Sequence, residues 1–172
     1  NNLNILVAFP ISISASIEML DMLISSFSLS DKNYQFSLKA HPAVGVGNIT
    51  SGLFKQLPSN FVFSSERSFS KLMRTSSLLI TEASSVCLES LALGRPVIIM
   101  QSSRGLTYDP IPDDISENLY RRCNSSEALK QSVDHFTNLS EAEKLKNSEQ
   151  GFSIRSNYFE PVTSEGIFRF LN

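Results

Sequence analysis

The residues with the clearest chemical potential lie within the segment 79–99. A short apolar run is followed by a small turn rich in hydroxyl groups, then by a helical pattern that stops at Gly94, and then by a second apolar run. Such a turn places backbone N–H groups and hydroxyls at the start of a helix, where a negatively charged group is favoured. We therefore predict a phosphate-binding turn here, with Ser84 and Ser85 as its candidate contacts, and include Thr81 and Glu82 at the end of the preceding strand among the candidate nucleotide-binding residues.

A histidine provides the second candidate. His41 follows another apolar run directly, and Pro42 fixes the backbone after it. Its imidazole could donate a hydrogen bond to a phosphate or act as a general acid toward it, which makes it the single candidate catalytic group. The alternatives are structural, because the imidazole could simply cap a strand and the serines could simply cap a helix. Glu82 and Glu89 could accept hydrogen bonds from ribose hydroxyls, since Glu89 lies about one helical turn beyond the serines. The alternative for Glu89 is an ion pair or an exposed position on the helix.

These residues must be positioned by the elements around them. Apolar runs alternate with helical patterns, which is typical of βαβ units, and unbroken apolar runs suit strands that are buried on both faces. The expected strands are 4–9, 34–40, 60–63, 77–81, 96–100 and, at an edge, 119–123; the expected helices are 14–27, 68–75, 84–93, from 125 or 126 to 136, 140–158 and 163–170. Ser14 is the expected N-cap of the first helix, and Ser140 with Glu143 forms a capping-box pattern.

The predicted fold class is α/β, with a doubly wound, Rossmann-like parallel sheet in one domain that spans residues 1–172. In such sheets, ligands bind outside the carboxyl ends of the strands, so the His41 and Ser84 loops should meet there. The sequence has no Gly-x-Gly-x-x-Gly after the first apolar run and no Walker motif, which counts against a dinucleotide oxidoreductase and a P-loop enzyme.

Composition restricts the partners. The net charge is −2, the isoelectric point is near 5.7, and the densest basic cluster is the pair Arg121 and Arg122, so no nucleic-acid partner is expected. Two cysteines are too few for a disulfide framework or a thiolate metal site. The sequence contains no Asp-x-Asp motif, and we predict neither a metal nor a cofactor.

Two motifs together resemble a known family. The first is Leu-Lys-Ala-His-Pro at 38–42. The second is Thr-Glu-Ala-Ser-Ser at 81–85, followed by Glu-Ser-Leu-Ala-Leu-Gly-Arg-Pro-Val at 89–97. They resemble the C-terminal, nucleotide-sugar-binding half of GT-B glycosyltransferases, in particular bacterial enzymes with cytidine-activated donors: sialyltransferases, Kdo transferases and polyol-phosphate transferases of wall teichoic acid synthesis. The resemblance implies that His41, with Pro42, and the pair Ser84 and Ser85 contact the donor phosphate. Ser90 stands where the family pattern usually has alanine.

The resemblance also implies a function. It suggests the donor-binding domain of a glycosyltransferase that uses a CMP-activated sugar to build capsule or lipopolysaccharide. The alternatives are half of a UDP-N-acetylglucosamine 2-epimerase, with Glu89 on the ribose, or a CDP-polyol phosphotransferase domain. The expected partners are the nucleotide-sugar donor, a carbohydrate acceptor and an N-terminal acceptor domain absent from this chain, and the full-length protein is expected in the cytoplasm at the membrane's inner face. The chain alone would bind donor and not catalyse transfer.

Overall fold

The computed structural model describes residues 3–27, 34–51, 57–102, 110–159, 161 and 163. Its six strands form one fully parallel sheet in the order β3-β2-β1-β4-β5-β6. The strands are β1 (Leu3–Ala8), β2 (Tyr34–Lys39), β3 (Phe61–Phe63), β4 (Leu78–Thr81), β5 (Val97–Met100) and β6 (Tyr120–Cys123). This is the Rossmann strand order, which confirms the predicted fold class.

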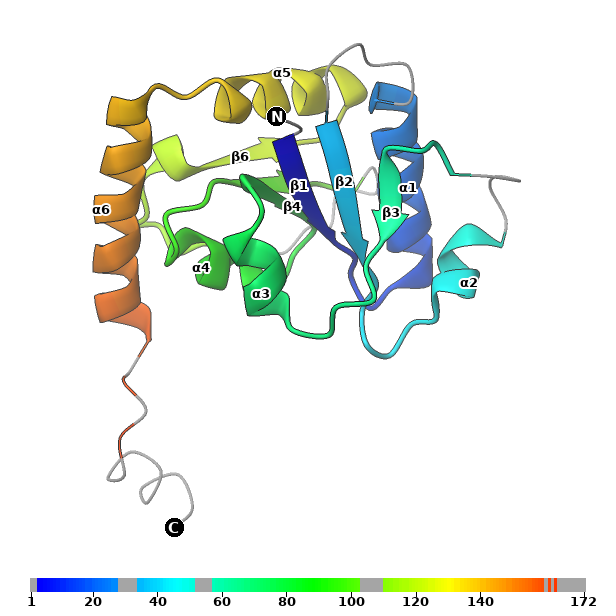
Figure 1. The fold of residues 1–172 in the computed structure, drawn as a ribbon, viewed down its shortest axis with the longest axis horizontal. Helices are drawn as coiled ribbons and strands as arrows, with labels where there is room; N and C mark the ends of the chain where they lie inside the picture. The colour runs from blue at the N-terminus through cyan, green and yellow to red at the C-terminus, as the bar shows by residue number, and fades with distance from the viewer. Residues whose placement is uncertain are drawn as a thin grey trace.

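Helices cover both faces of the sheet (Figure 1). They are α1 (Ile13–Phe27), α2 (Val46–Thr50), α3 (Phe69–Arg74), α4 (Val86–Leu91), α5 (Ser126–Thr137) and α6 (Glu141–Tyr158), with a short 3-10 turn at Glu117–Leu119. In β1, Ile5 and Val7 pack with α1 and α5 on one face. The alternate residue Leu6 packs with α3, α4 and α6 on the other face. Because neither face meets water, the strands have the continuous apolar sequences from which they were predicted.

Serine side chains are the N-caps of several helices. Ser140 forms the predicted capping box with Glu143, and Ser125 accepts a hydrogen bond from the backbone N–H of Ala128. The first helix differs from the prediction, because Ser12 and not Ser14 is the cap. The Oγ of Ser12 accepts from the N–H of Ala15 at 3.3 Å, three residues on, as an N-cap does, whereas Ser14 already lies inside α1.

The end of α4 touches α6 through backbone atoms. Gly94, with φ +68°, ends the helical segment as predicted, in the left-handed conformation that glycine tolerates. A methyl group on Gly151 of α6 would lie 2.4 Å from the Gly94 nitrogen and 2.8 Å from its Cα. Nearby, Arg155 donates a hydrogen bond to the carbonyl of Ala92 at 3.1 Å. The two helices therefore approach as closely as they do because no side chain separates them.

One prediction falls outside the described residues: the last helix at 163–170, of which only 163 is described. A search of the described helices finds none that is both long and apolar enough to cross a membrane.

We expect Gly151→Ala to lower the free energy of unfolding by about 1–3 kcal/mol, because the added methyl group collides with backbone that cannot rotate away. Gly47→Ala in α2 is the matched control. A methyl group there meets nothing within 4 Å, and alanine favours a helix by about 0.5–1 kcal/mol, so this variant should be as stable as the wild type or more stable. Urea unfolding measures both, and equal stability of the two variants would contradict the close-contact interpretation.

Candidate functional site

The three central strands end in one row. The register pairs Ala8 of β1 with Lys39 of β2 on one side and with Thr81 of β4 on the other. Neighbouring strands lie about 4.8 Å apart, so β2 and β4 end about 10 Å from each other. We call the side of the sheet where the strands end the carboxyl edge. His41 and Ser84 leave this same edge, two and three residues beyond the row, on either side of β1.

The turn after β2 orients the imidazole of His41. The backbone N–H of Ala43 donates a hydrogen bond to Nδ1 at 3.1 Å, and the N–H of Val44 donates to the His41 carbonyl at 2.8 Å. Because Nδ1 acts as an acceptor, the neutral ring must carry its proton on Nε2. The half-buried ring is therefore held by its own turn, with Nε2–H as the donor that a ligand would meet.

The serine turn after β4 uses its backbone, and not the Ser85 side chain, to begin α4. The N–H of Cys87 donates to the Ser84 carbonyl and the N–H of Leu88 to the Ser85 carbonyl, both at 3.1 Å. The Ser85 hydroxyl makes no capping hydrogen bond, and its side chain is exposed. Ordinary capping, the alternative role for this serine, is therefore not observed. Because the N–H groups of Cys87 and Leu88 are used in this way, a ligand at this turn would meet the earlier N–H groups, those of Ser84, Ser85 and Val86.

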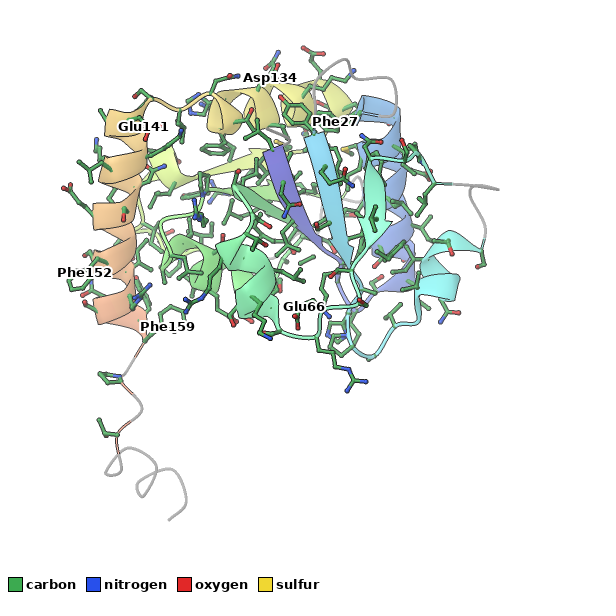
Figure 2. The ribbon with its side chains drawn as sticks, in the orientation of Figure 1. Phe27, Glu66, Asp134, Glu141, Phe152 and Phe159 are labelled. Atoms are coloured by element: carbon green, nitrogen blue, oxygen red, sulfur yellow. The ribbon has the colours of Figure 1, made fainter. Side chains whose placement is uncertain are left out.

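Two polar residues of the row, Thr81 and Lys39, form hydrogen bonds to neighbouring segments of the chain. Thr81 is 1% exposed, and its hydroxyl donates to the Ala8 carbonyl at 2.9 Å. Although the sequence made Thr81 a candidate nucleotide contact, its side chain is turned into the sheet, because the register places it inside the β1–β4 pair. Lys39 reaches across to the loop after β3 and donates to the Glu66 carbonyl at 2.7 Å. Figure 2 shows Glu66 at this carboxyl edge, where the backbone N–H of Ser68, at 2.8 Å, holds the pKa of its carboxylate below the usual value.

Two glutamates lie close together beside the serine turn. Glu82 follows β4 directly and is half-buried, and Glu18 comes from α1. Burial raises the pKa of Glu82 above its ordinary value of 4.5, and the charge of Glu18 raises it further. Both carboxylates line a shallow depression with Gln101 and Ser102, which follow β5.

Sequence reasoning missed Glu18 as a site residue. Its place one helical turn into α1, the helix that begins at the carboxyl edge, is the signal that could have pointed to it. Glu89 is exposed in the first turn of α4, beyond the serines. The described residues contain no cluster of three or more histidine, cysteine, aspartate or glutamate side chains that could hold a metal ion.

The family model for CDP-Glycerol:Poly(glycerophosphate) glycerophosphotransferase matches residues 19–148. The chain belongs to this family. The match includes both loops at the carboxyl edge. Among the families that the two motifs resemble, it favours the polyol-phosphate transferases. The resemblance to sialyltransferases and Kdo transferases gains no support from it.

Solved structures show a similar fold. The glycosyltransferase SnogD from Streptomyces nogalater is 18% identical, with a TM-score of 0.69 over 100% of this chain and 44% of its own. The wall teichoic acid polymerase TagF is 18% identical, with a TM-score of 0.60 over 99% of this chain and 42% of its own. The calicheamicin glycosyltransferase CalG4 is 13% identical, with a TM-score of 0.63 over 90% and 38%. The chain thus has the fold of a GT-B glycosyltransferase half and spans 38–44% of the length of these proteins. A search of curated proteins finds no match.

Because the pKa of Glu82 is raised in the folded state, the folded protein binds more protons than the unfolded chain between pH 4.5 and that raised value. The free energy of unfolding should therefore fall as pH rises through this window. Glu82→Gln should remove this part of the fall and make the protein more stable than the wild type at pH 7. Urea unfolding at several pH values between about 4 and 7 measures the effect.

Glu149→Gln, at an exposed position of α6, controls for the loss of one carboxylate elsewhere. If Glu82→Gln and Glu149→Gln gave the same pH profile, the assigned environment of Glu82 would be incorrect.

Proposed function

We propose that this chain binds the cytidine diphosphate part of CDP-glycerol at the carboxyl edge and holds it during transfer of glycerol phosphate to a poly(glycerophosphate) acceptor. The observation that carries the proposal is the position of the His41 turn and the Ser84–Ser85 turn. In a chain of this family, both leave one edge of the sheet on either side of β1. That is the crevice in which doubly wound sheets bind nucleotides.

The spacing of the turns supports a diphosphate donor. The strands that carry the two turns end about 10 Å apart, with β1 between them. A diphosphate offers two phosphoryl groups and can therefore meet donors from both sides, whereas a CMP-linked sugar offers only one. The family match supports the same choice over the capsule or lipopolysaccharide donor, and one similar structure is TagF soaked with CDPG. Glu89, beyond the serines, is our candidate for the ribose hydroxyls.

The reaction gives a role to each hydrogen-bonding group at the carboxyl edge. A terminal hydroxyl of the polymer attacks the β-phosphorus, the new oxygen–phosphorus bond forms, and the bond from the β-phosphorus to the bridging oxygen breaks. CMP leaves with that electron pair, so negative charge grows on the α-phosphate. We assign the stabilisation of this charge to the Nε2–H of His41 and to the N–H and hydroxyl groups of the serine turn. The proton of the attacking hydroxyl goes to a base that we assign, with the acceptor site, to the part of the longer enzyme outside this chain.

Isothermal titration calorimetry with CDP-glycerol, CDP, CMP and UDP tests the proposal. We expect CDP-glycerol and CDP to bind more tightly than CMP, and CDP to bind more tightly than UDP. A preference for UDP would contradict the cytidine assignment and favour the epimerase alternative.

His41→Ala should weaken CDP binding by about 1–3 kcal/mol, the worth of a hydrogen bond to a charged group. The matched control is His135→Ala, which removes an exposed imidazole from α5 that is not at the carboxyl edge. Calorimetry of both variants, with thermal unfolding to establish that they are folded, gives the comparison. Unchanged CDP affinity in folded His41→Ala would rule out its assigned role.

The double variant Ser84→Ala, Ser85→Ala should weaken CDP binding by roughly tenfold, because the hydroxyls are lost while the backbone N–H groups remain. Ser153→Ala on the exposed part of α6 is the control and should bind CDP like the wild type. Equal affinities of the double variant and its control would show that the hydroxyls do not contact the donor.

A further inference from the structure

The segment between β3 and α3, residues 64–68, is tied to the carboxyl edge through its backbone. We call this segment the β3 loop. The N–H of Ser64 donates a hydrogen bond to the carbonyl of Leu38 in β2 at 2.8 Å. The N–H of Glu66 donates to the Ser64 hydroxyl at 3.1 Å, and the Glu66 carbonyl accepts from the Nζ of Lys39 at 2.7 Å. Hydrogen bonds within the chain therefore fix the loop relative to the end of β2.

The carboxylate of Glu66 is fixed as well. Its Oε1 accepts a hydrogen bond from the backbone N–H of Ser68 at 2.8 Å, and its Oε2 lies 3.7 Å from the Nζ of Lys71. The N–H of Ser68 and the charge of Lys71 keep the pKa of this carboxyl below its ordinary value of 4.5, so the group is ionised at neutral pH. The side chain is 38% exposed, and each carboxylate oxygen can accept a second hydrogen bond. Glu66 thus presents a fixed, charged acceptor at the carboxyl edge.

The β3 loop and Glu89 belong to the same face of the sheet. The loop leads into α3, Glu89 is carried by α4, and both helices pack against the face that contains Leu6. Figure 1 shows α3 and α4 beside each other. In the proposed function Glu89 binds the ribose, so the base attached to that ribose lies toward this face. Glu66 is the only acidic residue of the sequence between Asp31 and Glu82, which makes it the carboxylate that the base would meet there.

Two other carboxylates at the carboxyl edge lie toward the opposite face. Glu18 and Glu82 line the shallow depression together with Met19 of α1, and α1 packs against the face that contains Ile5. The volume of this depression is about 10 Å³, which holds no more than one water molecule. A pyrimidine ring does not fit into it, so this pair does not compete with Glu66 for the base.

A carboxylate can distinguish cytosine from uracil. Cytosine has an amino group at C4, which donates hydrogen bonds, whereas uracil has a carbonyl oxygen there, which only accepts them. An ionised carboxylate also only accepts, so it attracts the amino group and repels the carbonyl oxygen. The three serine hydroxyls of the β3 loop both donate and accept, and they cannot make this distinction. Glu66 is therefore the residue of the loop whose chemistry can select the base.

We propose that Glu66 determines the base specificity of the donor site by accepting a hydrogen bond from the 4-amino group of cytosine. The inference rests on the proposed function, because it requires that the ribose of the donor lies at Glu89. Lys39 is a positioning residue in this arrangement, since it fixes the backbone of Glu66 and does not contact the base.

Calorimetry with CDP and UDP on the wild type and on Glu66→Gln tests the inference. Glutamine has the same shape, and its amide oxygen can still accept from the Ser68 N–H, so the β3 loop should keep its conformation. We expect the ratio of the CDP affinity to the UDP affinity to fall about tenfold or more. The reason is that the charged hydrogen bond to cytosine is lost and the glutamine amide can donate to the uracil oxygen.

Glu149→Gln, at an exposed position of α6, is the matched control and should keep the wild-type ratio. Thermal unfolding establishes that both variants are folded. An unchanged ratio in folded Glu66→Gln would overturn the inference.

A second measurement tests the same hydrogen bond without a variant. The probe is the diphosphate of a cytidine analogue that has hydrogen in place of the 4-amino group. The wild type should bind this probe about tenfold more weakly than CDP, because the carboxylate of Glu66 no longer meets a donor. Equal affinity for the probe and for CDP would show that the amino group is not recognised and would overturn the inference, whether or not Glu66→Gln folds.

The outcomes separate this inference from the proposed function. If the wild type prefers CDP to UDP and Glu66→Gln keeps that preference, only the assignment of Glu66 fails. If the wild type does not bind CDP, the donor site itself fails, and the assignment of Glu66 fails with it.

Discussion

Parallel pairing of β1 with both β2 and β4 is the constraint on which the fold and the candidate site depend. The row of Lys39, Ala8 and Thr81 is closed by hydrogen bonds on both sides: the Phe9 N–H donates to the Lys39 carbonyl at 3.0 Å, and the Thr81 hydroxyl donates to the Ala8 carbonyl. Since the chain runs outward from β1 in both directions, the connections on the two sides diverge. The histidine turn and the serine turn consequently leave the same edge of the sheet on either side of β1, although they lie about forty residues apart in sequence.

At the candidate site, backbone hydrogen bonds hold the uncharged hydrogen-bond donors of the two turns in place. The ring of His41 is set by the N–H of Ala43, and the serine turn begins α4 through its carbonyls while the Ser85 hydroxyl stays outside the helix. Lys39, the nearest cation in the row, is tied to the Glu66 carbonyl instead. In the proposed function, the donor phosphates would therefore meet an imidazole and backbone N–H groups that the turns themselves hold in place, and donors fixed before the ligand arrives stabilise a developing charge most effectively.

Local pattern was enough to predict most elements, because strands buried on both faces and helices capped by serine leave signals in consecutive residues. Strand ends came within about two residues, and the Ser140 capping box was predicted correctly. What pattern could not decide depends on tertiary placement. Ser12 and Ser14 are the same residue type, and only the direction of the chain after Pro10 selects the cap. From its place at the end of a strand, Thr81 was a candidate nucleotide contact, yet its buried hydroxyl donates to the Ala8 carbonyl of the neighbouring strand. The proximity of Glu18 to Glu82 exists only once helices dock.

The contact of Gly94 with Gly151 has a mechanical consequence. Two helices that touch through main-chain atoms have no side chains to rearrange between them, so neither slides past the other without breaking the contact. The serine turn lies at the opposite end of the short helix α4, about two helical turns before this backbone contact. If a neighbouring domain or a bound molecule displaced α6, the contact would therefore move the serine turn with it, because few side chains between them could rearrange to absorb the displacement.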